Sequence, residues 1–221
     1  MRYRSSMRRG QAIMRRPSYE ARREGRTGCR CRYGFSMLEL LVTVAIILIL
    51  TTLYWSPNSG SRQRSLQTAC QKSLQKVYIA LDVYANDWGG RFPNVRGAHT
   101  SGEALDLLVP KYTSDTASFI CPGSHDSEPP PGSSLAKHNV SYAYYMGRGV
   151  SDQQVVMSDK QVDTKAKEAG QQVFSTTGKP PGNNHRKYGG NFLFCDGHVE
   201  LSPAAAAFSL PLTNGEVLLN P

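Results

Sequence analysis

The sequence lacks the short motifs that mark the common enzyme classes. It contains no G-x-S-x-G nucleophile elbow, no H-E-x-x-H metal-binding helix and no glycine-rich loop that would cradle a phosphate. Ser, His and Asp are present, as in almost any chain, but no spacing joins them into a hydrolytic site. We therefore expect no enzymatic role, no catalytic residue and no cofactor.

The chain beyond residue 34 also lacks any excess of charge. The formal +9 of the whole sequence is carried by residues 1–34, which hold 11 Arg, no Lys and two Glu. The rest of the chain has 15 basic and 15 acidic side chains. Arg-rich arms can bind nucleic acid, but no folded module or aromatic surface accompanies this one. We therefore expect no nucleic-acid partner.

Residues 35–55 contain no Pro, no Gly and a single charge, Glu39. At about 1.5 Å per residue they would form a helix roughly 31 Å long, which is enough to cross a bilayer. Tyr54 and Trp55 at its end suit a membrane interface. The preceding basic block places residues 1–34 in the cytoplasm and the C-terminal part outside it. A buried helix of a soluble domain is the less favoured interpretation.

A secretory signal peptide is another alternative, because its n-region is also basic. The apolar run here is about twice the usual length of a signal peptide's h-region. No A-x-A-like cleavage site follows the run. The pattern therefore favours a membrane span with a leader in front of it.

Glu39 lies four residues after Phe35, inside the apolar run. A carboxylate in hydrocarbon costs about 2.5 kcal/mol or more at the bilayer centre, so it needs a cation. The run GFSMLELLVTVAIILIL resembles the processing site of type IV prepilins and type II secretion pseudopilins. The resemblance implies that a prepilin peptidase cuts after Gly34 and methylates the new N-terminal Phe35. It also implies that Glu39 meets the free amine of a neighbouring subunit.

The resemblance further implies a structural subunit of a type II secretion pseudopilus or a related type IV pilus-like filament, anchored in the bacterial inner membrane. Its partners would be the prepilin peptidase, other copies or other pseudopilins, a secretion or pilus assembly platform, and the lipid bilayer. The alternative is a membrane-tethered binding domain that uses the pilin signal only for delivery. Its contact surface would be formed by exposed Tyr142, Tyr144 and Tyr145 and by the long loops, unless most of these tyrosines pack on the helix.

Residues 56–90 predict a hinge followed by an amphipathic helix. Pro57 and Gly60 weaken any helix just after the span. Helical periodicity resumes at residues 62–88, where one stripe is apolar: Leu66, Cys70, Leu74, Val77, Leu81, Tyr84 and Trp88. A Gly pair followed by Pro93 ends the helix. The stripe should pack against the following domain, residues 91–221.

The sequence of residues 91–221 predicts a small antiparallel sheet. Period-two alternation indicates strands at residues 140–145 and 154–158. Residues 191–195 and 198–201 predict a hairpin with a two-residue Asp-Gly turn. Four such strands would receive the helix stripe on their apolar face. The fold class is therefore α+β, a long N-terminal helix on a small antiparallel sheet, which is also the layout of pilin-like subunits.

The connecting segments predict shorter elements. A capping box at residues 100–103 opens a short helix that runs to Val109. Residues 119–122 predict a short extended piece, and the Pro-rich residues 124–134 predict an exposed loop. The tail from Pro203 predicts a helical turn and an edge segment.

The segment from Asn184-His185 to Val199 resembles the C-terminal signature of a subclass of prepilin-like proteins. Within it, His185, Asp196 and His198 suggest ligands that converge on one metal ion. Asp196 is explained equally well by the turn, because Asp-Gly is a preferred turn pair. We therefore assign no metal site to these residues.

Major pseudopilins have a calcium site in a C-terminal loop, and the resemblance makes one conceivable here through Asp152, Asp159 or Asp196. No dense, regularly spaced set of oxygen ligands is present in the sequence. Calcium is therefore not assigned.

The five cysteines divide between the leader and the rest of the chain. Cys29 and Cys31 lie in the leader, on the reducing side, and are expected as free thiols. Three cysteines follow, an odd number. In an oxidising compartment the candidate disulfide is Cys121 with Cys195, and Cys70 is buried in the helix stripe. Buried free thiols are the alternative.

Overall fold

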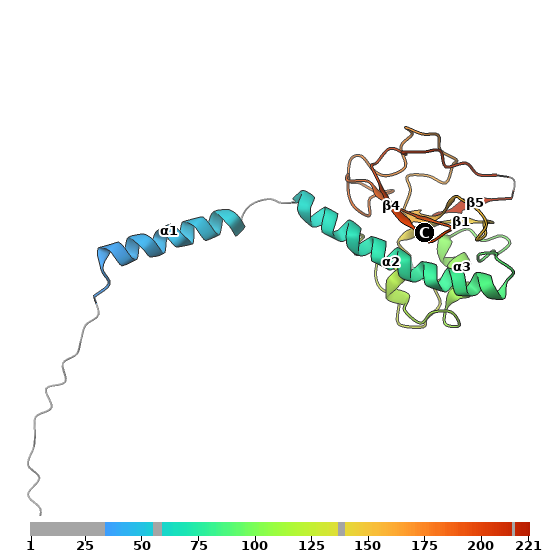
Figure 1. Ribbon diagram of the computed structural model, residues 1–221, viewed down its shortest axis with the longest axis horizontal. Coiled ribbons are helices and arrows are strands. Elements are labelled where there is room, and N and C mark those ends of the chain that lie inside the picture. The colour runs from blue at the N-terminus through green and yellow to red at the C-terminus, as the bar shows by residue number, and fades with distance from the viewer. Residues whose placement is uncertain (1–33, 55–58, 137–139, 214) are drawn as a thin grey trace, which may run out of the picture. The chain divides into compact units, whose positions relative to one another are not determined.

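The computed structural model describes residues 34–54, 59–136, 140–213 and 215–221. The chain divides into two units, Met1–Ser56 and Pro57–Pro221 (Figure 1). Most of the leader, the hinge residue Pro57 and the aromatic residue Trp55 lie outside the described residues. The expectations for them stay predictions.

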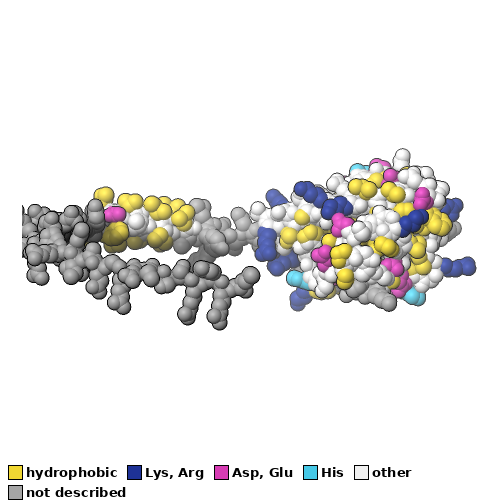
Figure 2. All heavy atoms as spheres, turned by 90° about the horizontal axis from the view of Figure 1, so that it is seen from below, with side chains coloured by type: hydrophobic (Ala, Val, Ile, Leu, Met, Phe, Trp, Pro, Cys, Tyr) yellow, Lys and Arg dark blue, Asp and Glu magenta, His cyan; other side chains and the backbone are white. Residues whose placement is uncertain are grey.

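The first unit contains helix α1 (Met37–Tyr54), which has 18 residues and begins two residues after Phe35. Every side chain described between Met37 and Thr52 is exposed, and hydrophobic side chains cover the face of α1 seen in Figure 2. Within the part of the chain that the structure describes, no helix combines the length and the apolar character needed to cross a membrane.

The hydroxyl groups of α1 are satisfied inside the helix. Thr43, Thr51 and Thr52 each donate a hydrogen bond to the carbonyl oxygen three residues earlier, at 2.8–2.9 Å. This back-bonding removes the need of these hydroxyls for water. Glu39 is the only charged residue of the helix.

The second unit is built on a five-stranded antiparallel sheet with the order β4-β3-β2-β1-β5. The strands are β1 (Tyr142–Met146), β2 (Val155–Asp159), β3 (Gly190–Phe194), β4 (Val199–Ser202) and β5 (Val217–Leu219). The first four match the four predicted strands, and the α+β class is confirmed. The fifth strand pairs with β1 at one edge of the sheet, where the tail was predicted to add a segment. The four consecutive Ala form no helical turn.

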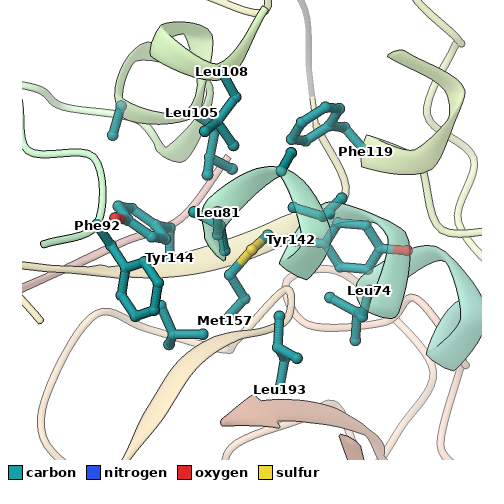
Figure 3. Packing of buried hydrophobic residues seen from close by; sticks show 14 of the residues in the cluster. Leu74, Leu81, Phe92, Leu105, Leu108, Phe119, Tyr142, Tyr144, Met157 and Leu193 are labelled. Atoms are coloured by element: carbon teal, nitrogen blue, oxygen red, sulfur yellow. The ribbon is translucent and has the colours of Figure 1, made fainter. Parts of the chain in front are cut away.

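One face of the sheet is covered by α2 (Ser59–Asp87) and by three short helices: α3 (Ser101–Leu105), η1 (Asp106–Leu108) and η2 (Thr116–Phe119) (Figure 1). The predicted stripe of α2 is buried from Cys70 to Tyr84. Leu74 and Leu81 of this stripe point into a cluster with Tyr144, Met157 and Leu193 of the sheet (Figure 3). Burial of this apolar surface holds the helix on the sheet.

Both faces of the sheet are buried, whereas the sequence predicted one. Tyr142 and Tyr144 pack in the cluster beneath α2, and Ala143 and Tyr145 pack in a second cluster on the opposite face. Irregular segments at residues 167–174 and 204–212, orange to red in Figure 1, cover that face. They have no helical or strand period, which is why the pattern of the sequence did not reveal this layer.

Burial of the sheet removes the tyrosine part of the contact surface considered for a tethered binding domain. Tyr142, Tyr144 and Tyr145 are each 0% exposed. The expectation that they form an exposed binding surface is wrong, because covering layers on both faces enclose all three rings.

Both ends of the predicted helix stripe differ from the structure. Trp88 is 59% exposed because α2 ends at Asp87, and its ring stacks on Tyr84 at 5.5 Å between centroids. Gln67 is buried beside the stripe and donates to the carbonyl oxygen of Tyr188 at 2.8 Å, and Gln63 is buried as well. The buried face of α2 therefore continues past Leu66, where the apolar stripe begins, through polar side chains.

Three local predictions also need correction. The helix opened by Thr100 ends at Leu105 and continues as the 3-10 helix η1, and Val109 before Pro110 is extended, as the residue before Pro prefers. Phe119 closes the 3-10 helix η2 and is not in an extended piece. The β3–β4 hairpin has a three-residue loop, residues 195–197, because the Phe194 N–H donates to the His198 carbonyl. The Gly197 N–H donates to the Phe194 carbonyl, with Gly197 at φ +90°. A type I turn followed by a left-handed Gly gives this loop.

Arg148 is a buried cation that the sequence pattern did not single out. It donates to the carbonyl oxygens of Val155 and Pro211, lies over the Tyr145 ring at 4.4 Å, and pairs with the Glu216 carboxylate at 3.0 Å. Partial burial opposes ionisation of Glu216, but the hydrogen bond from Arg148 outweighs it and lowers the pKa of Glu216. The pair connects the end of β1 to the turn before β5.

We expect Glu216→Gln to destabilise the chain by about 1–3 kcal/mol near neutral pH, because a hydrogen bond to a charged group is lost. A lowered folded pKa contributes stability above the unfolded value, which is lost as the pH falls through the folded pKa. The difference between wild type and Glu216→Gln should therefore shrink below the ordinary Glu pKa of 4.5. Urea unfolding of the detergent-solubilised chain across this range measures it. The exposed Glu200→Gln is the control and should show no such convergence.

Candidate functional site

The Gly34-Phe35 junction lies outside α1 in irregular backbone. Phe35 is 75% exposed, and a Cβ added to Gly34 would meet no atom within 4 Å. α1 begins only at Met37. The peptide bond predicted for cleavage is therefore sterically open and carries no helical hydrogen-bond ladder.

Ser36 starts the helix and places Glu39 in its first turn. The Ser36 hydroxyl accepts the Leu38 N–H at 3.3 Å, and the Ser36 carbonyl accepts the Leu40 N–H at 3.0 Å. A carboxylate in the first turn is favoured by the helix dipole. Glu39 is exposed, and within the described part of the chain it forms no salt bridge.

The candidate disulfide between Cys121 and Cys195 is not formed. Cys70, Cys121 and Cys195 are free and buried. Cys121 lies beside Cys70, whereas the Cys195 N–H donates to the carbonyl oxygen of Gln154 after the end of β3. The pairing was wrong because it rested on cysteine number alone, and the prediction that Cys70 is buried in the stripe is confirmed.

Cys70 and Cys121 meet Asp159 and His185 in a buried cluster, which we call the Cys-His-Asp cluster. One ligand atom from each of the four side chains lies within 4.8 Å of all the others. The Cys70 Sγ is 3.3 Å from Asp159 Oδ1, and the His185 Nε2 is 3.3 Å from both Cys121 Sγ and Asp159 Oδ2. All four residues are at most 1% exposed. Among the residues that the structure describes, it is the one group of this composition.

The fold explains why these residues meet. Asp159 ends β2 and is paired in register with Tyr142 of β1, on the face that carries α2. Cys70 belongs to the buried stripe of α2 and lies over this pair, 3.3 Å from the Tyr142 hydroxyl. Cys121 follows η2, and His185 lies in the loop before β3. Four separate parts of the chain therefore supply the cluster.

Asp159 is held as an anion by several donors. It accepts the Asn184 amide at 2.8 Å and both the backbone N–H and the side-chain amide of Asn191, at 2.7 and 3.1 Å. Burial opposes its ionisation, but the hydrogen bonds from His185 and Asn184 lower the pKa of Asp159. Burial likewise opposes protonation of His185, but Asp159 and Cys121 raise the pKa of His185 to about 10.

The arrangement differs from a nucleophilic triad. In a triad, the base accepts from the nucleophile through one ring nitrogen and is oriented through the other. Here Cys121 and Asp159 both approach the Nε2 of His185, and the buried Nδ1 has no hydrogen-bond partner among the described residues. The four side chains therefore converge on one point, as the ligands of a metal ion do.

His185, Asp196 and His198, which were considered as metal ligands and not assigned, do not converge. Asp196 and His198 form an exposed pair at the β3–β4 turn, where the His198 N–H donates to Asp196 at 3.1 Å and the ring stacks on Phe194. His185 lies in the buried cluster instead. The turn explains Asp196 without a metal.

The three acids considered for calcium also lie in different environments. Asp159 belongs to the Cys-His-Asp cluster, Asp152 accepts the Gly149 N–H at 2.7 Å, and Asp196 pairs with His198. Sequence reasoning missed Cys70 and Asp159 as partners of His185. The one available signal was the Asn184-His185 pair in the C-terminal signature.

The C-terminal signature has a structural explanation at each of its parts. Asn184 and Asn191 bond Asp159, and His185 faces the same carboxylate. A Cβ on Gly189, which has φ +84°, would approach the Ser202 carbonyl to 2.0 Å, and one on Gly197 would approach the Tyr78 ring to 2.4 Å. The signature therefore builds the cluster and the adjoining hairpin.

The comparison with known protein families matches the N-terminal processing segment of the chain. Residues 29–54 match the family model described as the prokaryotic N-terminal methylation motif, which supports a type IV pilin-like precursor with a signal for prepilin peptidase. No curated protein and no solved structure matches the chain.

Proposed function

We propose that this chain is a subunit of a type II secretion pseudopilus or a related type IV pilus-like filament. Residues 1–34 act as a basic cytoplasmic leader, residues 35–55 anchor the precursor in the inner membrane, and the remainder is extracytoplasmic. The match to the methylation motif carries this proposal, because it covers the Gly34-Phe35 junction and Glu39 together.

The surface of α1 supports an apolar environment. Large apolar side chains are exposed all around the helix, for example Leu41 at 70% and Leu48 at 60%. Such a surface is stable only against lipid or against other apolar helices. In the precursor the surroundings would be the bilayer, and in the filament they would be the helices of neighbouring subunits.

Glu39 gives the proposed assembly its register. Cleavage after Gly34 creates a positively charged amine on Phe35, the counter-charge that a carboxylate in an apolar bundle requires. Side-chain packing would hold the helices together, and the ion pair between Glu39 and a neighbour's Phe35 would fix their axial offset.

The N-terminus of the membrane-extracted protein tests the processing step. We expect mass spectrometry to show a chain that begins at Phe35 with a methylated amine. Deleting the prepilin peptidase should leave the Arg-rich leader attached. A mature chain that begins at any other residue would refute the cleavage proposal.

A further inference from the structure

We propose that Cys70, Cys121, Asp159 and His185 form a structural zinc site in the second unit. Two thiolates, an imidazole and a carboxylate are the ligand types that Zn²⁺ prefers in four-coordinate protein sites. Calcium takes six to eight oxygen ligands, and the cluster offers one carboxylate. The donor set therefore selects a soft or borderline metal.

The spacing of the donor atoms fits a tetrahedron. With Zn–S of about 2.3 Å and Zn–N or Zn–O of about 2.0–2.2 Å, neighbouring ligands of a tetrahedral site lie about 3.3–3.8 Å apart. The Cys121 Sγ lies 3.3 Å from His185 Nε2, and Cys70 Sγ and His185 Nε2 each lie 3.3 Å from one of the two Asp159 oxygens. With one oxygen of Asp159 as ligand, all four donor atoms lie within 4.8 Å of one another, so small side-chain movements would bring each to bonding distance of one ion.

Burial identifies the site as structural. The four side chains are shielded from solvent and leave no open position for a substrate, as in closed zinc sites. The ion would join α2 to the end of β2, to the segment after η2 and to the loop before β3. It would fix the N-terminal part of α2 on the domain, where buried Gln67 replaces apolar packing.

Polar groups around the cluster hold the Asp159 and Cys70 side chains in place. Asn184 and Asn191 hold the Asp159 carboxylate, and the Tyr142 hydroxyl lies 3.3 Å from the Cys70 sulfur, where it can donate to a thiolate. Nε2 of His185 faces the cluster, so the tautomer protonated on Nδ1 presents its lone pair to the ion.

Metal binding also needs ionised ligands and an entry path. On zinc binding, Cys70 and Cys121 release their thiol protons and His185 gives up its Nε2 proton to solvent. Gly123 lines two surface crevices and lies against the His185 ring, where an added Cβ would come within 2.6 Å of Nδ1, so opening of this contact would give the ion a route.

The test uses the full chain purified in detergent without chelator. We expect about one zinc per chain by elemental mass spectrometry, as one closed site requires. Replacement by Co²⁺ should give the absorption bands of a tetrahedral thiolate site. Removing zinc with a chelator should lower the unfolding temperature of wild type, and adding Zn²⁺ should restore it.

Single variants locate the ion. Cys121→Ser and His185→Gln should each weaken zinc affinity by at least about 100-fold. Mutation of residues that only hydrogen-bond a metal ligand already weakens metal affinity by about 10- to 100-fold. Cys195→Ser is the matched control, since Cys195 is the third buried cysteine and lies outside the cluster. It should bind zinc as wild type does.

Three outcomes would overturn the zinc site. One is wild-type chain that contains no zinc and takes up none. Another is equal zinc affinity in wild type, Cys121→Ser and His185→Gln. The last is a Cys70–Cys121 disulfide in unreduced peptide maps of the isolated protein. None of these outcomes bears on cleavage after Gly34, so the zinc site and the proposed filament role can fail separately.

Discussion

Glu39→Ala is expected to reduce incorporation of the chain into filaments by about 10- to 100-fold while cleavage after Gly34 continues. A charge-assisted hydrogen bond contributes about 1.5–3 kcal/mol, and each 1.4 kcal/mol is a factor of ten. In the proposed filament this interaction joins Glu39 to the amine of a neighbouring Phe35. Cross-linking of whole cells measures assembly as a ladder of multimers, and N-terminal mass analysis measures cleavage.

Thr43→Ala is the matched control for Glu39→Ala. Thr43 follows Glu39 by one turn, and its hydroxyl bonds only the Leu40 carbonyl within α1. This variant should give wild-type ladders. Normal ladders from Glu39→Ala would show that packing alone sets the register, and the role proposed for the carboxylate would be wrong.

Asp159→Ala is expected to lower the free energy of unfolding by about 3–5 kcal/mol. Removing a buried charged group leaves the opposite charge uncompensated. In the metal-free chain that charge is the His185 imidazolium, 3.3 Å away, and with zinc bound it is the ion, in a cluster at most 1% exposed. Asn184 and Asn191 would also lose the acceptor of their amide hydrogen bonds. Urea unfolding of the detergent-solubilised chain, followed by circular dichroism, measures the loss.

Asp115→Ala provides the comparison for Asp159→Ala. Asp115 pairs with Lys76 at 3.1 Å on the surface, and both side chains are largely exposed. Exposed pairs contribute about 0–1 kcal/mol, so this variant should stay within about 1 kcal/mol of wild type. An equally small loss for Asp159→Ala would mean that the cluster does not stabilise the domain.

The sequence predicted the sheet because its strands carry their own local pattern. The period-two pattern of residues 140–145 predicted β1, and the runs on either side of Asp196-Gly197 predicted β3 and β4. Each prediction lies within one or two residues of the strand in the structure. Strand β5 has only three residues, so its pattern was too short to identify a strand. Its place in the sheet comes from pairing with β1, which is distant in the sequence. The layer over the second face was missed for the same reason, since its segments pack without regular structure.

The candidate sites differ in the same way. Gly34, Phe35 and Glu39 lie within six residues, so their spacing alone identifies the processing signal, and the family match covers it. The disulfide prediction failed because nothing in cysteine number or spacing tells which distant cysteines become neighbours. In the folded chain Cys121 lies beside Cys70 and His185, whereas Cys195 is buried in the core after the end of β3.

By itself the sequence determined the cleavage signal, the apolar helix that follows it, the long amphipathic helix and most strands of the sheet. Each depends on residues close together in the chain, where backbone preference and hydrophobic period act directly. Only the tertiary structure decided that Cys70, Cys121, Asp159 and His185 share one point. Their contact requires α2 to lie on the sheet with β2 in register beside β1, and no local pattern encodes such an arrangement of four distant segments.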